Sequence, residues 1–445
     1  MNYSVISKWA LLVGILLAQA CSAIAQDLSF QRAQKVYDFL VGGQGDSIYV
    51  NLTKELQAQL SPAVFNETFD KTEQQFGKLQ SKGEWQKEVV QGHSLYYADM
   101  KFERYNLRFL VSFDKDQHIN TLRLMPVPAE PVKSTATYDK TKISEQDITI
   151  ETDGFKLPGT LTLPLGKTKV PVVILVHGSG PNDRDETIGP NKPFRDLAWG
   201  LAKHGIAVIR YDKRTRIYGE SFVPVGRQMD FDVETVDDAL SAIKLAKSRA
   251  EIATDSVYIL GHSLGATLAP RIAERSKELA GIILLAGLAR PLEDAIVEQT
   301  TYLTALSDTS AAAKAKIATV KQQALNIKRI GTADFDAKVP LLLNIPSSYW
   351  AFANAYKPVN VAAKLSLPIL ILQGERDYQV TMEDFGLWRT GLIGHKNVHF
   401  KSYPKLNHLM QEGSGKSVPA EYGQPSSIPD YVVNDVASFV RHKNL

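Results

Sequence analysis

The pentapeptide Gly-His-Ser-Leu-Gly at 261–265 places a serine where its hydroxyl could act as a nucleophile. An apolar, strand-like run at 256–260 precedes it, and the residues from 266 onward have the composition of a helix. A serine between a strand and a helix, with small neighbours on both sides, is typical of a tight turn that lifts the hydroxyl toward a substrate. The pattern therefore predicts Ser263 as the nucleophile of a covalent mechanism.

A serine hydroxyl is a weak nucleophile, so it needs a base within hydrogen-bond reach and an acid that orients the base. Asp377 comes soon after the apolar run at 367–372, and His408 follows the next strand-like run at 398–403. Serine, acid and histidine in this chain order are one of the known arrangements of a catalytic triad. We therefore predict Asp377 as the acid and His408 as the base.

Other residues compete for these roles. Glu375 and Asp384 are the nearby alternatives for the acid, and His395 and His399 are the alternatives for the base. The two histidines precede or lie within the last strand, whereas the base is expected in the loop after it. His262 adjoins the nucleophile, but neighbours on a sharp turn project in different directions, so we expect its ring to point away.

A glycine-rich loop at 177–181 follows the apolar run that ends at residue 176. Glycines on both sides of Ser179 allow backbone N–H groups to come close to a ligand, as an oxyanion hole requires. We predict that the backbone N–H groups of Ser179 and Leu264 bind the oxyanion. His177 is expected to brace this loop and not to transfer protons.

A charged run at 182–186 follows the glycine-rich loop. Runs of this kind usually form a solvated face, and the alternative is that this one gates the site or selects substrates. Arg184 is the member of the run that we would test first for such a role.

The region 143–445 alternates strand-like and helical patterns. Runs at 147–152 and 160–164 alternate as in an antiparallel hairpin, and the later runs are almost continuously apolar, as in parallel strands covered on both faces. We predict an α/β fold with a mostly parallel, doubly wound sheet, whose sites gather at the carboxyl ends of the strands. The segment 288–363 interrupts the alternation after the sixth strand and is predicted to form a helical cap over the site.

Three motifs in this region carry a resemblance to a known superfamily. They are HGSGPNDRDETIG at 177–189, VIRYDKRT at 208–215 and GHSLGA at 261–266. The region resembles the α/β-hydrolase superfamily, and the motifs are similar to those of bacterial, exported, two-domain carboxylesterases. The resemblance implies Ser263 as nucleophile, Asp377 as acid, His408 as base, and hydrolysis of esters without a metal or another cofactor.

The first 25 residues have the layout of a secretory signal peptide. Lys8 precedes an apolar run at 9–18, which is shorter than a transmembrane helix, and small residues follow up to position 25. We therefore predict a signal peptide at 1–25 and export to the periplasm or the extracellular space. An alternative is a lipid anchor on Cys21, the sole cysteine of the chain.

The region 27–125 is predicted to form a separate small α+β domain. Helical spacing and later alternating runs indicate helices at 30–40, 51–60 and 66–79 and strands at 94–103, 105–114 and 119–125. A linker at 126–142, rich in Pro, Thr and Lys, follows it. The small domain resembles modules of the nuclear-transport-factor type. Its residues leave open whether it forms a dimer, covers the active site or docks on polysaccharide.

Composition narrows the classes of partner. The 445 residues carry a net charge of only +3, and we find no block of Lys and Arg and no Cys and His cluster, so neither nucleic acid nor a metal is expected. We predict a carboxylesterase that cleaves short-chain acyl esters of small molecules through an acyl-enzyme. The alternatives are a peptidase or amidase of the same fold, and an inactive envelope protein that binds or acts as a scaffold.

Overall fold

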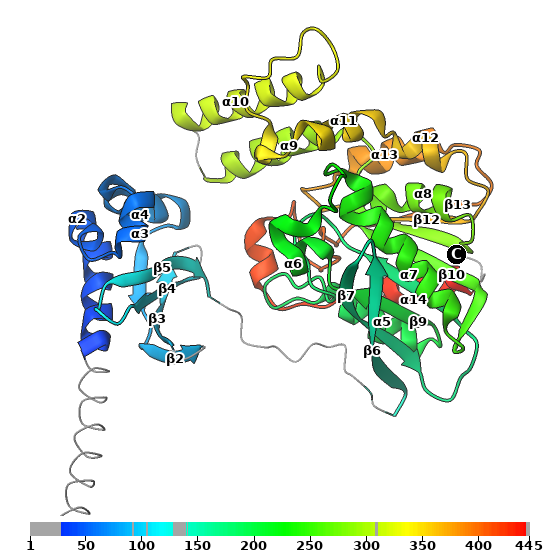
Figure 1. Ribbon diagram of the computed structural model, residues 1–445, viewed down its shortest axis with the longest axis horizontal. Coiled ribbons are helices and arrows are strands. Elements are labelled where there is room, and N and C mark those ends of the chain that lie inside the picture. Colours follow the sequence, from blue (N-terminus) through cyan, green and yellow to red (C-terminus); the bar gives the residue numbers. More distant parts are fainter. Residues whose placement is uncertain are drawn as a thin grey trace, which may run out of the picture. The chain divides into compact units, whose positions relative to one another are not determined.

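The computed structural model describes residues 28–90, 93–103, 106–127, 139, 141–307 and 310–441. The chain divides into two compact units, Met1–Pro128 and Ala129–Leu445 (Figure 1). The predicted signal peptide at 1–25, with Cys21, lies outside the described residues, as does most of the predicted linker. Export and the lipid anchor therefore stay predictions.

The N-terminal unit combines helices with an antiparallel sheet. Its helical segments are 28–41, α2 (Gly45–Tyr49), α3 (Lys54–Gln59) and α4 (Pro62–Phe76), and its strands are β1 (Leu79–Lys82), β2 (Gln86–Val90), β3 (His93–Phe102), β4 (Asn106–Phe113) and β5 (Ile119–Pro126). The strand order is β1-β3-β4-β5, and β2 also pairs with β3. Tyr37, Trp85 and Phe109 pack edge to face, with ring centroids 5.5 to 6.0 Å apart. This unit thus has an aromatic core of its own.

The described part of the second unit is built on an eight-stranded sheet in the order β13-β12-β11-β10-β8-β9-β7-β6. The strands are β6 (Ile143–Thr152), β7 (Phe155–Pro164), β8 (Val170–Val176), β9 (Ala207–Tyr211), β10 (Ile252–His262), β11 (Gly281–Leu285), β12 (Ile369–Gly374) and β13 (Val398–Tyr403). The pairs β6–β7 and β7–β9 are antiparallel, and the remaining pairs are parallel. The carboxyl ends of β8, β10, β12 and β13 therefore open on one edge of the sheet.

Helices cover both faces of this sheet. They are α5 (Pro193–Lys203), α6 (Arg214–Tyr218), η1 (Gly219–Phe222), η2 (Asp232–Val236), α7 (Asp237–Ser248), α8 (Leu264–Ser276), α13 (Met382–Gly391), η4 (Pro419–Gly423) and α14 (Asp430–Val440). Ile174 on β8 packs in the core shared with α7, α8 and α13, whereas its neighbour Leu175 packs in the core shared with α5 and α14. Successive side chains of a strand point to opposite faces, so apolar residues are needed at every position of β8.

Between β11 and β12 the chain leaves the sheet and forms a helical layer. Its elements are α9 (Leu292–Ser307), α10 (Ala311–Ile327), η3 (Leu342–Asn344), α11 (Ser347–Ala355) and α12 (Pro358–Ala362). Figure 1 shows α9, α10 and α11 together at the top of the view, on one side of the sheet. Trp350, Ile327 and Leu342 form a small core within this layer. These helices occupy the interval for which a cap is predicted.

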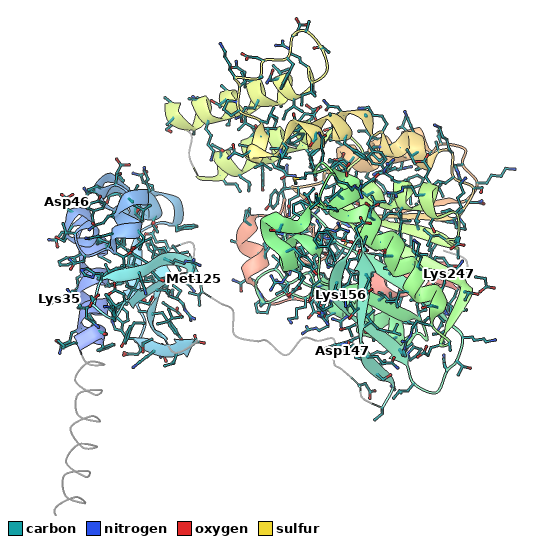
Figure 2. The ribbon with its side chains drawn as sticks, in the orientation of Figure 1. Lys35, Asp46, Met125, Asp147, Lys156 and Lys247 are labelled. Carbon is teal, nitrogen blue, oxygen red and sulfur yellow. The ribbon has the colours of Figure 1, made fainter. Side chains whose placement is uncertain are left out.

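The outer strands β6 and β7 carry exposed charged residues. Asp147 on β6 and Lys156 on β7 are exposed and project from the sheet edge that lies opposite β13 in the strand order (Figure 2). In the described portion of the chain, no helix combines the length and the apolar character needed to span a membrane.

Candidate active site

Ser263 lies in the turn that joins β10 to α8. Its φ of 53° and ψ of −115° are unfavourable for a residue with a side chain, so the turn holds it in a strained conformation. The Ser263 N–H donates to the Leu285 carbonyl of β11 at 2.9 Å, and the Ser263 carbonyl accepts from the Thr267 N–H at 3.0 Å. Hydrogen bonds to a strand on one side and a helix on the other therefore maintain the strained serine.

The glycines of the pentapeptide are required by close backbone approach. A Cβ atom at Gly261 would lie 2.1 Å from the Gly265 carbonyl oxygen. A Cβ atom at Gly265 would lie 2.1 Å from the Val176 carbonyl oxygen at the end of β8. Neither position can accept a larger residue without a backbone shift, which is the physical reason for the motif.

His408 and Asp377 are in direct contact. The His408 Nδ1 lies 2.7 Å from Asp377 Oδ2, and both side chains are buried. The other carboxylate oxygen accepts the backbone N–H groups of Gln379 at 2.7 Å and Val380 at 3.1 Å. Because an ionised carboxylate only accepts, it fixes the proton on Nδ1 and leaves Nε2 of a neutral ring as an acceptor.

The competing candidates lie elsewhere. Glu375 accepts the Ser402 hydroxyl at 2.7 Å, and Asp384 accepts two backbone N–H groups in the segment that leads into α9. The Nε2 of His395 lies 2.7 Å from a backbone carbonyl, and the ring of His399 faces α14. These side chains are thus engaged in contacts outside the His408 and Asp377 pair.

The loop after β8 places Ser179 at the cavity. The preceding carbonyl, that of Gly178, accepts the Lys213 ammonium at 2.9 Å and the Asn182 amide at 3.2 Å. In a planar trans peptide the carbonyl and the next N–H point in opposite directions, so these bonds orient the Ser179 N–H. Leu264 is the first residue of α8, where backbone N–H groups have no acceptor within the helix. Ser179, Leu264, Ser263 and His408 all line one cavity.

His177 braces the same loop. Its Nε2 lies 3.0 Å from the Asp183 carbonyl oxygen, and its ring packs against Phe194 and Tyr211 at centroid distances of 5.0 and 5.4 Å. Burial lowers the pKa of His177 from 6.5 to about 4. The ring is therefore neutral near pH 7 and acts as a structural donor.

Glu186 and His262 are site residues that the sequence reasoning missed. His262 was expected to point away, but its Nε2 lies 2.9 Å from the backbone carbonyl of His408. Glu186 belongs to the charged run interpreted as a solvated face, yet it is only 2% exposed and contacts His262 Nδ1 at 2.8 Å. An acidic residue a few positions after a glycine-rich loop is the one sequence signal that could have suggested it.

Arg184 has a different role from the one considered for it. Its guanidinium binds both oxygens of Asp212 at 2.8 and 3.1 Å, and it also contacts the Gly159 carbonyl and the Thr160 hydroxyl at 3.1 Å. These bonds attach the charged run to β7 and to the residue after β9. These contacts favour a structural role for Arg184 over substrate selection.

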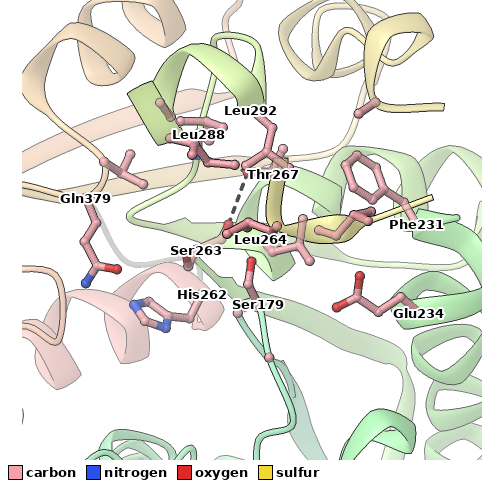
Figure 3. A pocket seen from close by; sticks show the side chains of 18 of the residues that line it. Ser179, Phe231, Glu234, His262, Ser263, Leu264, Thr267, Leu288, Leu292 and Gln379 are labelled. Carbon is pink, nitrogen blue, oxygen red and sulfur yellow. Dashed lines mark hydrogen bonds between the residues drawn. The ribbon is translucent and has the colours of Figure 1, made fainter. Parts of the chain in front are cut away.

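The cavity has a volume of about 620 Å³ and lies between the strand ends and the cap. In Figure 3, Ser179, Ser263 and Leu264 lie close together, with His262 on one side and Phe231 and Glu234 on the other. The apolar part of the lining comes from the η2 region, the elbow and the cap, and includes Met229, Phe231, Leu264, Leu288, Leu292, Ile296, Ile345, Tyr349 and Tyr356. No pattern in the sequence indicated which cap residues would face Ser263.

A buried ion pair lies behind the wall of the cavity that Glu234 and Tyr349 line. Lys213 donates to Glu234 Oε1 at 2.5 Å, and the Tyr349 hydroxyl donates to Glu234 Oε2 at 2.6 Å. Lys213 and Glu234 are almost fully buried. The charges of this wall are therefore already matched within the protein. Among the described residues, His, Cys, Asp and Glu side chains nowhere form a group of three or more suited to a metal.

A strained serine on an elbow, a histidine and aspartate pair at neighbouring strand ends, and a capped parallel sheet together define an α/β-hydrolase of the serine type. The family model described as "Serine aminopeptidase, S33" matches residues 170–414, and one described as "Protein of unknown function (DUF3887)" matches residues 33–122. The chain belongs to the S33 family of hydrolases.

Its relatives include an esterase that matches nearly the whole chain. Esterase EstD of Thermotoga maritima is 35% identical over 394 residues, which cover 87% of this chain and 89% of that protein. Among solved structures, Est1E from Butyrivibrio proteoclasticus is 19% identical and covers 66% of this chain and 98% of its own, with a TM-score of 0.42. The Pyrococcus furiosus esterase PF2001 is 17% identical and covers 67% and 91%, with a TM-score of 0.44.

The family match and the EstD relationship settle the coarse predictions. The predicted α/β-hydrolase fold with a helical cap, preceded by a small α+β domain, is confirmed. The prediction of a carboxylesterase-type serine hydrolase is also confirmed.

Proposed function

We propose that the chain hydrolyses carboxylic esters with Ser263 as nucleophile, His408 as general base and Asp377 as the acid that orients His408. One observation carries the proposal. The 2.7 Å bond from His408 Nδ1 to Asp377 lies directly behind a histidine that shares a cavity with the strained serine. This arrangement leaves the His408 Nε2 free of the carboxylate and able to take a proton from Ser263.

The reaction has two halves. His408 takes the hydroxyl proton while Ser263 Oγ bonds to the ester carbonyl carbon, and the imidazolium then protonates the departing alcohol. Water repeats the sequence on the acyl-enzyme and releases the acid. Asp377 stabilises the imidazolium in both halves, and its second oxygen is held by the N–H groups of Gln379 and Val380.

The oxyanion of each tetrahedral intermediate is assigned to the N–H groups of Ser179 and Leu264. The first is oriented by the Lys213 bond to Gly178, and the second lies at the positive end of α8. Loss of one such donor costs roughly 2.7 to 4 kcal/mol of transition-state stabilisation in a serine hydrolase. The orientation of the peptide bond between Gly178 and Ser179 is therefore expected to contribute substantially to the rate.

The size of the cavity favours substrates larger than acetate esters. Its volume of about 620 Å³ lies in the range of pockets that hold drug-sized ligands. The hydroxyls of Tyr349 and Tyr356 are bound to Glu234 and to the Thr267 carbonyl, so their rings add apolar surface to the lining. We propose that the enzyme accepts esters of medium-length acyl chains as well as the short-chain esters predicted from the sequence.

A peptidase is the second candidate, because the matching family model is described as a serine aminopeptidase. An aminopeptidase has to bind a free ammonium group, for which it needs an available carboxylate. Among the described residues, the carboxylates on the cavity lining are Glu186 and Glu234, and each already faces a buried partner, His262 or Lys213. This pairing favours the ester over the peptide with a free amine.

The test compares the wild type with Ser263→Ala in the full chain. We expect kcat on p-nitrophenyl esters to fall by several orders of magnitude, on the order of 10⁶ in the best-studied serine hydrolase series. Ser248→Ala, an exposed serine at the end of α7, is the matched control and should be unaffected. A series from acetate to octanoate, run beside aminoacyl anilides, separates the two candidates. Activity that survives in Ser263→Ala, or folded wild type that a fluorophosphonate does not label, would refute the proposal.

A further inference from the structure

The carboxylate of Glu186 joins two loops of the site. Its Oε1 accepts the Gly178 N–H at 2.7 Å, and its Oε2 accepts the His262 Nδ1–H at 2.8 Å. Gly178 immediately precedes the oxyanion donor Ser179, and His262 immediately precedes the nucleophile. A Cβ atom at Gly178 would lie 3.1 Å from the Ser263 Cβ, so the two loops are in close contact at this point.

The His262 ring continues the connection to a third loop. Its Nε2 lies 2.9 Å from the backbone carbonyl of His408, and the two imidazole centroids are 4.7 Å apart. A carbonyl oxygen only accepts, so Nε2 carries a proton, and an ionised carboxylate at Nδ1 also only accepts. Both ring nitrogens therefore donate when Glu186 is ionised, and His262 is an imidazolium.

The charges in this buried pair stabilise each other. Burial alone lowers the pKa of His262, but the attraction of Glu186 and the bonds to Glu186 and to the His408 carbonyl outweigh it, so the pKa lies above its ordinary value. Burial alone raises the pKa of Glu186, and the cationic His262, with the Gly178 N–H, brings it below the ordinary value. His177 and Asp377 are the other titratable groups that act on the pair.

We propose that Glu186 and His262 are positioning residues that set the oxyanion loop and the catalytic histidine in register with Ser263. The inference rests on the proposed function. Gly178, Glu186, His262 and His408 form one buried hydrogen-bonded chain across the loops after β8, β10 and β13. Both ring nitrogens of His262 are occupied, so the ring transfers no proton during the reaction. Its effect is on geometry.

This series of hydrogen bonds directly links the loop of the oxyanion donor to the loop of His408, and the two groups must act together. The oxyanion donor has to meet the carbonyl oxygen while His408 meets the serine proton, and a misplacement of about 1 Å can cost 10²-fold in rate. The sheet fixes the strand ends, but the loops extend beyond the sheet. A buried carboxylate with two defined partners supplies the missing constraint at the place where the loops touch.

The test uses full-length Glu186→Ala, Glu186→Gln and Glu186→Asp. Glu186→Ala removes both bonds, and we expect kcat to fall about 100-fold with KM changed less than about 3-fold. Glutamine has the same length, can accept from Gly178 and can donate to a neutral His262, so kcat should stay within about tenfold of the wild type. Aspartate keeps the charge but is one methylene shorter and cannot reach both partners. We therefore expect kcat to be higher in Glu186→Gln than in Glu186→Asp.

A matched control separates positioning from stability. Asp238→Asn changes a buried carboxylate that binds Arg214 at 2.8 Å, on α7 and outside the cavity. All values are expressed per folded molecule, from urea unfolding and thermal melts. Asp238→Asn should lower stability and leave kcat per folded molecule unchanged.

The outcomes are distinct. Ser263→Ala is measured in the same series, and full activity there would overturn the proposed function together with this inference. If Ser263→Ala is inactive but Glu186→Ala keeps kcat within about 3-fold per folded molecule, only the positioning role is wrong. If Glu186→Ala does not fold, the order of the other two variants decides. An Asp variant at least as active as the Gln variant would overturn the proposal.

Discussion

We expect one buried histidine, His177, to make the second unit less stable at acidic pH. The pKa of His177 falls from 6.5 to about 4 because burial penalises the charged ring. Well above pH 6.5 the ring is uncharged in both the folded and the unfolded state. Between pH 6.5 and about 4 the unfolded state binds the proton and the folded state does not, so stability falls as the pH falls. The difference corresponds to about 3 kcal/mol, since one pKa unit is worth about 1.36 kcal/mol.

The experiment compares the wild type with His177→Gln. Glutamine can still donate toward the Asp183 carbonyl but does not titrate, and it loses the ring contacts with Phe194 and Tyr211. The variant should therefore be less stable at neutral pH. The difference between the free energies of unfolding of the two proteins should then decrease by about 3 kcal/mol on acidification to about pH 4. Equilibrium urea unfolding at several pH values, followed by tryptophan fluorescence, gives the difference. The N-terminal unit is identical in both proteins, so its contribution cancels in the difference between the two free energies of unfolding. A gap that stays constant across this interval would refute the reasoning.

Two further predictions concern the oxyanion loop and the elbow. Lys213→Met should lower the free energy of unfolding by about 3 to 5 kcal/mol, because it leaves Glu234 buried without its cation. The double variant Lys213→Met with Glu234→Leu should recover much of this loss, as measured by urea unfolding. Losses that simply add in the double variant would contradict this. Gly265→Ala should reduce kcat/KM more than about 100-fold, because its Cβ would meet the Val176 carbonyl at 2.1 Å. Gly386→Ala in α13, where nothing lies within 4 Å of the added Cβ, is the matched control in the same assay, and equal activity of the two variants would show that the elbow tolerates a side chain.

The sequence was informative where a signal is local. Ser263, Asp377 and His408 each follow a strand-like run, so their positions at strand ends could be predicted from the runs alone. Their partners could not. Glu186 reaches His262 across 76 positions of sequence, and whether a charged residue faces water or a buried cation depends on the fold around it.

The N-terminal unit shows the same limit. The helical spacing at 66–79 predicted a helix, but α4 spans Pro62–Phe76, because Pro62 suits the first turn of a helix and Gly77, with a φ of 84°, ends it. The strands β1 and β2 were missed since Leu79–Lys82 and Gln86–Val90 are mostly polar and exposed. They are held by pairing with β3, a contact that the residues of these strands do not encode.

The geometry of the site is set by the parallel sheet and by buried polar side chains beyond the sheet. The parallel sheet delivers four loops to one edge, and the strain of Ser263 is held by bonds to β11 and α8. Beyond the sheet, buried polar groups set the finer geometry: Lys213 donates to the Gly178 carbonyl, and Glu186 accepts the Gly178 N–H. The cap has a small core of its own around Trp350, yet its Tyr349 bonds to Glu234, the partner of Lys213. The Tyr349 wall of the cavity is thus bonded, through Glu234 and Lys213, to the peptide that orients the N–H proposed as oxyanion donor.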